Sequence, residues 1–98
     1  PNLQKNVFQT FHTYIITVNR RDELKKFLQK KKISTAIHYP KLIFDQNAYK
    51  EKFNIINKKK FPVASRLVKK ILTLPINQFL SKLEIENICD EIKKFYKR

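Results

Sequence analysis

The chain has 98 residues, a length that suits one domain near the lower end of the usual size range. Hydrophobic residues make up 42% of it and aromatic residues 12%, which indicates a folded rather than a disordered chain. No apolar run approaches the roughly 20 residues that span a bilayer, and the N-terminus lacks the pattern of a signal peptide. Cys89 is the only cysteine, which excludes an intramolecular disulfide and a cysteine-based metal cluster. We therefore expect a cytoplasmic protein without a membrane partner.

The formal net charge is +14 at pH 7, from 22 Lys and Arg residues against 8 Asp and Glu residues. Such a charge attracts nucleic acids and anionic membranes non-specifically. The lysines are scattered through every segment, as a biased composition without any ligand would also produce. Glycine is absent, which excludes a P-loop, the dinucleotide-binding fingerprint and the glycine-containing motifs of KH and RNP proteins. A small basic nucleic-acid-binding α+β module is therefore an alternative function that the charge supports and no motif does.

The first predicted elements are a strand and a helix. Residues 11–18 are β-branched or aromatic almost throughout, which predicts a strand that is covered rather than a solvated edge. Asn19 is predicted to cap the following helix, with Asp22 in its first turn. The helix has one apolar stripe, formed by Leu24, Phe27 and Leu28. The lysines at 30–32 close it, either as a solvated helix end or as a phosphate contact.

Residues 33–38 are the second predicted strand, because β-branched residues alternate there with smaller ones. The segment ends in His38 and Tyr39, just before Pro40, which stops strand pairing. An imidazole and a phenol at the end of a strand are typical of a site on a rigid scaffold. The alternative is that His38 is a surface or satisfied core histidine and Tyr39 part of the core. His12 is the only other histidine, so no metal-ligand spacing exists.

The second half of the chain begins with a predicted short helix over 46–53 and an exposed polar loop over 54–60. Pro62 is well suited to the first position of a further amphipathic helix. Residues 71–76 form the third predicted strand, again ended by a proline. The segment as a whole predicts helix, loop, helix and strand.

Ser81 and Glu84 have the spacing of a capping box, which predicts the start of a terminal helix. Its apolar stripe consists of Ile85, Ile88, Cys89, Ile92 and Phe95 or Tyr96. Cys89 is therefore expected to be a small core residue rather than a nucleophile. In total, three strands and three or four helices predict one two-layer α+β domain over residues 1–98, with helices on one side of a sheet of about three strands.

Several segments together resemble, in order and spacing, the C-terminal part of DegT/StrS-type sugar aminotransferases. The segments are Arg-Asp-Glu-Leu at 21–24 with Phe-Leu at 27–28, Ile-Ser-Thr-Ala-Ile-His-Tyr-Pro at 33–40, Gln46 with Ala-Tyr-Lys at 48–50, Phe-Pro-Val-Ala-Ser-Arg-Leu at 61–67, and Thr-Leu-Pro at 73–75. The likeness spans roughly residues 11–97 and includes the capped terminal helix.

The departures from the family pattern concern four positions. Lys32 stands where the family usually has a glycine between helix and strand, so that turn must accommodate a side chain. Leu42 and Phe44 replace a proline and a histidine, and Ser65 replaces a frequent glutamate. These changes affect details of the sugar pocket more than the fold.

The resemblance implies that residues 1–98 are the small C-terminal domain of a larger fold-type-I enzyme that depends on pyridoxal phosphate. The parent would be a homodimer that transfers an amino group from glutamate to a nucleotide-linked keto sugar, for polysaccharide, glycan or antibiotic sugar biosynthesis. The family's cofactor-binding residues belong to the large domain. This chain is therefore expected to hold no cofactor, no metal and no catalytic residue, and to be inactive alone.

The same resemblance gives the small domain the task of covering the active-site cleft. His38 and Tyr39 would then bind the sugar side of the substrate. The large domain of the same polypeptide would be the principal partner, and no specific nucleic acid is expected.

Overall fold

The computed structural model describes residues 3–50 and 60–97, and its fold is α+β. In chain order the elements are strand β1 (Tyr14–Thr17), helix α1 (Arg21–Lys30), a 3-10 turn η1 (Ile43–Asp45), helix α2 (Asn47–Lys50), helix α3 (Pro62–Leu67), strand β2 (Ile71–Leu74) and helix α4 (Lys82–Tyr96). In the described parts of the chain, no helix has the length and apolar character needed to cross a membrane.

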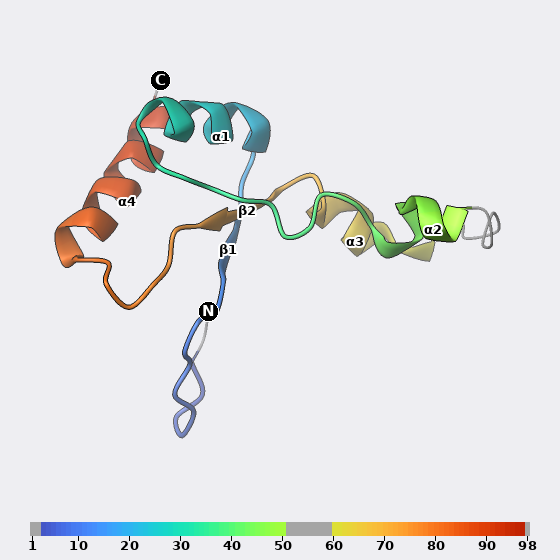
Figure 1. Ribbon diagram of the computed structural model, residues 1–98, viewed down its shortest axis with the longest axis horizontal. Helices are drawn as coiled ribbons and strands as arrows, with labels where there is room; N and C mark the ends of the chain where they lie inside the picture. Colours follow the sequence, from blue (N-terminus) through green and yellow to red (C-terminus); the bar gives the residue numbers. More distant parts are fainter. Residues whose placement is uncertain (1–2, 51–59, 98) are drawn as a thin grey trace.

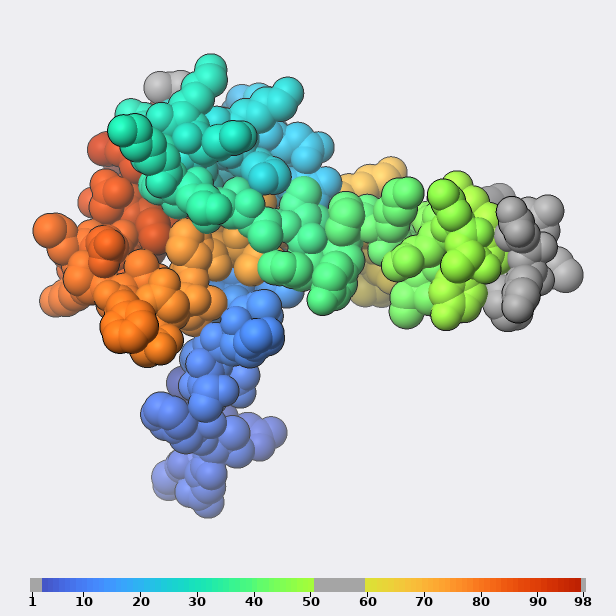
Figure 2. Space-filling view, in the orientation of Figure 1, coloured from blue at the N-terminus to red at the C-terminus, as the bar shows by residue number. Residues whose placement is uncertain are grey.

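The molecule has an extended outline with three parts. Helices α1 and α4 lie together beside the strands, α2 and α3 form an arm that extends away from them, and the N-terminal segment projects separately (Figure 1). The space-filling view has the same outline (Figure 2). The radius of gyration is 16.5 Å, against roughly 13 Å for a compact domain of this length. The arm and the N-terminal segment therefore leave much of the chain outside the packed part.

The sheet has two strands in the described residues, because β1 pairs antiparallel with β2 and the predicted strand over 33–38 is reduced to a single bridge. In that bridge Ala36 and Thr73 exchange both backbone hydrogen bonds, at 3.1 and 2.8 Å. The segment starts too close to helix α1 to pair further, since the amide of Ile33 donates to the carbonyl of Leu28 at 2.9 Å. The expectation of three strands is therefore not confirmed.

Strand β1 is covered on one face only. Tyr14 and Ile16 are half-buried, whereas Ile15 and Thr17 are exposed, Ile15 by 43%. This alternation is typical of an antiparallel strand with one face on the core and the other solvated. The prediction of a covered strand was wrong because the apolar run hides this alternation.

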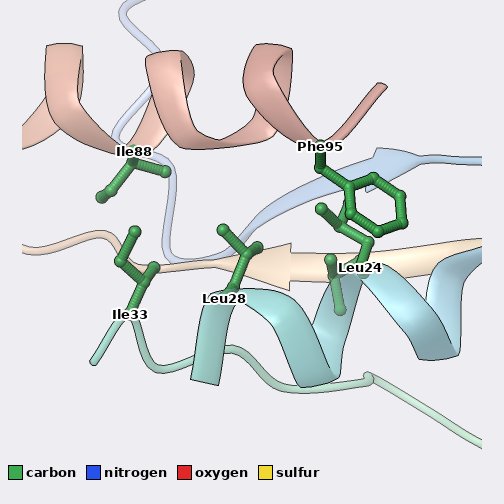
Figure 3. Packing of buried hydrophobic residues seen from close by; sticks show 6 residues of the cluster. Leu24, Leu28, Ile33, Ile88 and Phe95 are labelled. Carbon is green, nitrogen blue, oxygen red and sulfur yellow. The ribbon is translucent and has the colours of Figure 1, made fainter. Parts of the chain in front are cut away.

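The hydrophobic core lies where α1 and α4 meet over β2. Its buried side chains are Leu24, Leu28, Ile33, Leu72, Ile88 and Phe95. Figure 3 shows the leucines of α1 pointing toward the side chains of α4. Helix α1 contacts both α4 and β2, so the predicted apolar stripe of this helix is confirmed. Helices α2 and α3 do not contribute to this core, although the sequence predicts an inner face for each.

The predicted stripe of α4 is only partly buried. Ile88 and Phe95 are in the core and Ile92 packs against it. Cys89 is exposed, and Ile85 is 48% exposed. Successive helical residues are rotated by roughly 100°, so Ile85 and Cys89, four residues apart, share a neighbouring face that the described residues leave open. The prediction that Cys89 is a core residue was therefore wrong.

Helix α1 does not begin with the predicted Asn19 cap. The N-cap residue is Arg20, in the left-handed region, and no side chain makes a capping hydrogen bond. Asn19 instead accepts a hydrogen bond from Lys70 Nζ at 3.0 Å. Asp22 does lie in the first turn, as predicted. The acidic first turn thus supports the helix start without a side-chain cap.

Helix α4 begins with the predicted capping box. Ser81 Oγ accepts from the backbone amide of Glu84 at 3.2 Å, and the Glu84 carboxylate accepts from the amide of Ser81 at 2.8 Å. The hydrogen bond from the Ser81 amide is the main reason that the pKa of Glu84 lies below its ordinary value. Pro62 likewise opens α3 as predicted. The predicted loop over 54–60 and the end of the predicted helix over 46–53 lie mostly outside the described residues.

The turn after α1 is a Schellman motif with a lysine in the position that favours glycine. The amide of Lys32 donates to Gln29 and that of Ile33 to Leu28. Lys32 has a φ of 60°, a left-handed conformation that costs about 1–2 kcal/mol for a residue with a Cβ. The structure thus accommodates a side chain at this turn, as the departure from the family pattern requires.

Replacing Lys32 with glycine should therefore raise the free energy of unfolding by about 1 kcal/mol. Lys30→Gly is the matched control, because it removes the same charge but lies inside the last turn of α1, where glycine costs about 1 kcal/mol. Urea unfolding of the two variants should give changes of opposite sign. A loss of stability in both would contradict the interpretation of the Lys32 backbone.

Glu91 of α4 is a buried carboxylate that the sequence does not single out. Its side chain is 9% exposed, Oε1 accepts from Lys94 Nζ at 2.6 Å, and Oε2 lies 3.6 Å from Lys31 Nζ, beyond hydrogen-bond distance. The hydrogen bond from Lys94 is the main reason that the pKa of Glu91 is lowered; burial opposes it and the charge of Lys31 adds to it. Glu91 thereby connects the end of α1 to α4.

The lowered pKa of Glu91 predicts a pH dependence of stability. A depressed carboxylate pKa in the folded state contributes stability that is present above the ordinary pKa and is lost as the pH falls through the folded-state value. Glu91→Gln should therefore be less stable than the parent at neutral pH, and the difference should shrink below about pH 4. The control is Glu86→Gln, at an exposed position of the same helix. A Glu91→Gln difference that stays constant down to acidic pH would contradict the prediction.

Candidate substrate-binding groove

A groove of about 360 Å³ lies where the segment 33–38 runs beside the end of β2. Three parts of the chain form it: His12 and Thr13 before β1; Ser34, Thr35, Ala36 and His38; and the residues from Thr73 to Asn77. These parts are far apart in sequence, and the antiparallel pairing of β1 with β2 and the Ala36–Thr73 bridge bring them together. The groove therefore depends on the small sheet for its shape.

His38 lines this groove, as the sequence predicts for a site residue. Its ring is half-buried, and Nδ1 lies 2.9 Å from Thr73 Oγ1. Thr73 is itself only 6% exposed and is held by both backbone hydrogen bonds to Ala36. The imidazole is therefore fixed on one side by a rigid strand, while the other ring nitrogen has no partner among the described residues.

Tyr39 is not part of the groove lining in the described residues. It is 72% exposed, and its ring meets that of His38 edge-on, with centroids 5.3 Å apart and planes at 78°. The alternative that Tyr39 is part of the core is wrong, because its side chain is exposed to solvent. The structure thus puts His38 in the groove and Tyr39 beside it, at an exposed position.

His12, Thr73 and Asn77 also line the groove, and sequence reasoning did not assign them to a site. Their proximity follows from strand pairing, which a single sequence does not determine. The only available signal was that Thr73 stands in the Thr-Leu-Pro segment of the family resemblance. The two histidines of the chain therefore line the same hollow.

The groove lining contains no Lys, Arg, Asp or Glu among the described residues, although the chain carries a net charge of +14. Cations gather instead around a separate hollow between α1 and the end of α4, which includes Lys26, Lys30 and Lys31. No group of three or more His, Cys, Asp or Glu residues that could hold a metal ion occurs in the described ranges. The described lining of the groove thus contains two histidines together with uncharged polar and apolar residues.

The chemistry of the groove is that of binding. Imidazole, hydroxyl and amide groups can donate and accept hydrogen bonds, as a polyhydroxylated ligand requires. Among the residues that the structure describes, the lining has no lysine for a Schiff base and no carboxylate to activate a nucleophile. The chain is thus a small α+β domain with a groove whose described lining has no Lys, Arg, Asp or Glu.

Residues 1–93 match the model of the DegT/DnrJ/EryC1/StrS aminotransferase family. The chain belongs to this family. It is 24% identical over 95 residues to the dTDP-3-amino-3,6-dideoxy-alpha-D-galactopyranose transaminase of Aneurinibacillus thermoaerophilus, covering 97% of this chain and 25% of that protein.

Two solved structures have the same fold. A DegT DnrJ EryC1 StrS aminotransferase from Brucella abortus matches with a TM-score of 0.84 and 31% identity, over 100% of this chain and 26% of that one. S. venezuelae DesV in complex with a ketimine intermediate matches with a TM-score of 0.80 and 26% identity, over 89% of this chain and 23% of that one. The chain thus spans about a quarter of the length of the relatives it matches.

Proposed function

We propose that this chain is the small C-terminal domain of an aminotransferase that transfers the amino group of glutamate to a keto sugar carried on a nucleotide. Membership of the aminotransferase family supports the reaction class. The name of the Aneurinibacillus relative, a transaminase of a dTDP-linked amino sugar, supports the substrate class. The fourfold greater length of the relatives supports a parent enzyme with a further, larger domain.

The observation that carries the proposal is the hydrogen bond between His38 and Thr73. It joins the two segments with family-like sequence, 33–40 and 73–75, at one groove. Its described lining includes hydroxyl and imidazole groups beside apolar residues and has no Lys, Arg, Asp or Glu, which suits the sugar ring rather than the diphosphate of the substrate. In this proposal His38 contacts the sugar directly, and Tyr39 contacts it from the exposed side of His38.

Pyridoxal phosphate would be held by the large domain and not by this chain. A cofactor aldehyde needs a lysine amine, and its phosphate needs cations or backbone amides. In residues 3–50 and 60–97, the groove around His38 has neither a lysine nor an arginine in its lining. When bound, the cofactor supplies the electron sink for amine transfer, whereas the residues of this groove would bind and orient the sugar and exclude water. We therefore expect the chain alone to be inactive.

Several strongly exposed apolar side chains support the proposal that a large domain packs against this chain. Phe8 is 91% exposed, Phe79 84% and Leu83 75%. Apolar side chains this exposed on an extended molecule are typical of a surface that another part of a protein covers. The proposal assigns this role to the large domain of the same polypeptide, in a cytoplasmic homodimer.

The test is an assay of the complete enzyme with glutamate and a panel of nucleotide-linked keto sugars. We expect 2-oxoglutarate and the amino sugar to form in equal amounts with at least one of them. The 98-residue chain, assayed with the same substrates and added pyridoxal phosphate, should form neither. Amine transfer by the complete enzyme to acceptors of another class, with none to any nucleotide-linked keto sugar, would contradict the proposal.

A further inference from the structure

We propose that Thr73 is a positioning residue that fixes the tautomer of His38, so that Nε2 carries the ring proton and donates it in a hydrogen bond to a ligand oxygen in the groove. The inference rests on the proposed function for the identity of that ligand, a keto sugar. It rests on the structure alone for the tautomer. The tautomer determines whether Nε2 of His38 donates or accepts a hydrogen bond, which the role of a contact residue alone leaves open.

Thr73 is held firmly in the sheet. Its amide and carbonyl are both bonded to Ala36, and its neighbours in β2 pair with β1. The residue is 6% exposed. Its side chain lies on the sheet face opposite that of Leu72, because successive strand residues alternate. The low exposure of Thr73 therefore leaves its hydroxyl little access to water beside the His38 ring.

The protons available on Thr73 and His38 satisfy both side chains in only one arrangement. A threonine hydroxyl has one proton to donate, and a neutral imidazole has one donor and one acceptor nitrogen. In the described part of the chain, His38 Nδ1 is the partner of Thr73 Oγ1, at 2.9 Å. If Nδ1 donated its proton to Thr73 Oγ1, the hydrogen of that buried hydroxyl would have no acceptor among the described residues. If the hydroxyl donates, both groups are satisfied, as buried polar groups generally are. The proton of the neutral ring is then on Nε2.

The tautomer also sets which ligand atom can bind to Nε2 of His38. An Nε2–H group donates and does not accept, so its partner must supply an acceptor oxygen. His38 Nε2 has no hydrogen-bond partner among the described residues, so a ligand in the groove is free to supply that oxygen. A hydroxyl or carbonyl oxygen of a sugar fits this requirement. His38 then orients the sugar as a hydrogen-bond donor and does not act as the base that removes a proton from it.

The tautomer is measured directly by nitrogen-15 NMR of the complete enzyme labelled at histidine, without substrate and at a pH where the imidazole is neutral. The signal that is missing in His38→Gln identifies His38. We expect a directly bonded proton on Nε2 and none on Nδ1. A proton on Nδ1 in the parent enzyme would overturn the proposal, and this result does not depend on the folding of any variant at position 73.

Variants of Thr73 then separate positioning from a merely structural role. Thr73→Val keeps the shape and removes the donor, so a mixture of tautomers should appear and the KM for the sugar should rise by about 3- to 10-fold, with the glutamate half-reaction unchanged. Thr73→Ser should restore both readouts. Thr17→Val, the same change on β1 outside the groove lining, should change neither. An unchanged tautomer or unchanged sugar kinetics in Thr73→Val would overturn the proposal. A parent enzyme that aminates no keto sugar would instead overturn the proposed function and leave the NMR result standing.

Discussion

Replacing Leu72 with alanine should lower the free energy of unfolding by about 2–5 kcal/mol, the range for a buried leucine that leaves a cavity. Leu72 is fully buried at the centre of β2, within a core that has only six buried hydrophobic side chains in the described residues. It contacts the same cluster as the leucines of α1, so its loss would weaken the packing of helix on strand. Urea unfolding followed by circular dichroism measures the change.

The matched control for this substitution is Leu83→Ala on α4, with both variants measured in the 98-residue chain, where the proposed large domain does not cover Leu83. Leu83 is 75% exposed, and surface substitutions of this kind usually change stability by less than about 0.5 kcal/mol. The difference between the two variants isolates the contribution of burial. Equal effects at both positions would mean that the core does not lie between α1, α4 and β2.

Replacing His38 with alanine in the complete enzyme should lower kcat/KM for the sugar by roughly 5- to 100-fold. The range corresponds to the loss of one hydrogen bond, to an uncharged or a charged partner. The rate of amine transfer from glutamate to the cofactor should not change, because that half-reaction does not involve the sugar. Steady-state kinetics, together with single-turnover measurement of the glutamate half-reaction, separates the two effects.

Two further variants sharpen the His38 prediction. Tyr39→Phe removes only the exposed hydroxyl, and a smaller rise in the KM for the sugar is expected from the loss of one hydrogen bond at a solvated position. Gln29→Ala, on the exposed surface of α1, should leave the kinetics as they are. If His38→Ala and Tyr39→Phe both left the KM and kcat for the sugar unchanged, neither residue would bind substrate.

Local sequence patterns predicted the helices of this chain well. The capping box at Ser81, the proline that opens α3 and the leucine stripe of α1 are local signals, and each has its predicted place in the structure. His38, which lines the groove, was also singled out from its position at the end of an apparent strand, and its role in a site stays a prediction. These features depend on neighbours within a few residues, which a single sequence contains.

The features that failed depend on contacts between distant segments. The segment 33–38 has a strand-like composition, but the Schellman turn holds its first residue, and among the described residues only Ala36 pairs with β2 through its backbone. Cys89 follows the helical period, yet its side chain is exposed, because the strands and α1 pack against the Ile88 and Phe95 side of α4 instead. The partners of His38 in the groove, Thr73 and His12, become neighbours only through strand pairing. Pattern and spacing therefore give the elements, whereas tertiary pairing gives the site.

The most direct test of the central claim is a crystal structure of the complete enzyme with its amino-sugar nucleotide product bound. The claim predicts that the sugar ring lies in the groove between residues 34–38 and 73–77, with one of its oxygens within hydrogen-bond distance of His38 Nε2. It also predicts that the nucleotide diphosphate lies outside this uncharged groove. A sugar bound elsewhere, with the groove open to solvent and His38 in contact with water alone, would contradict the claim.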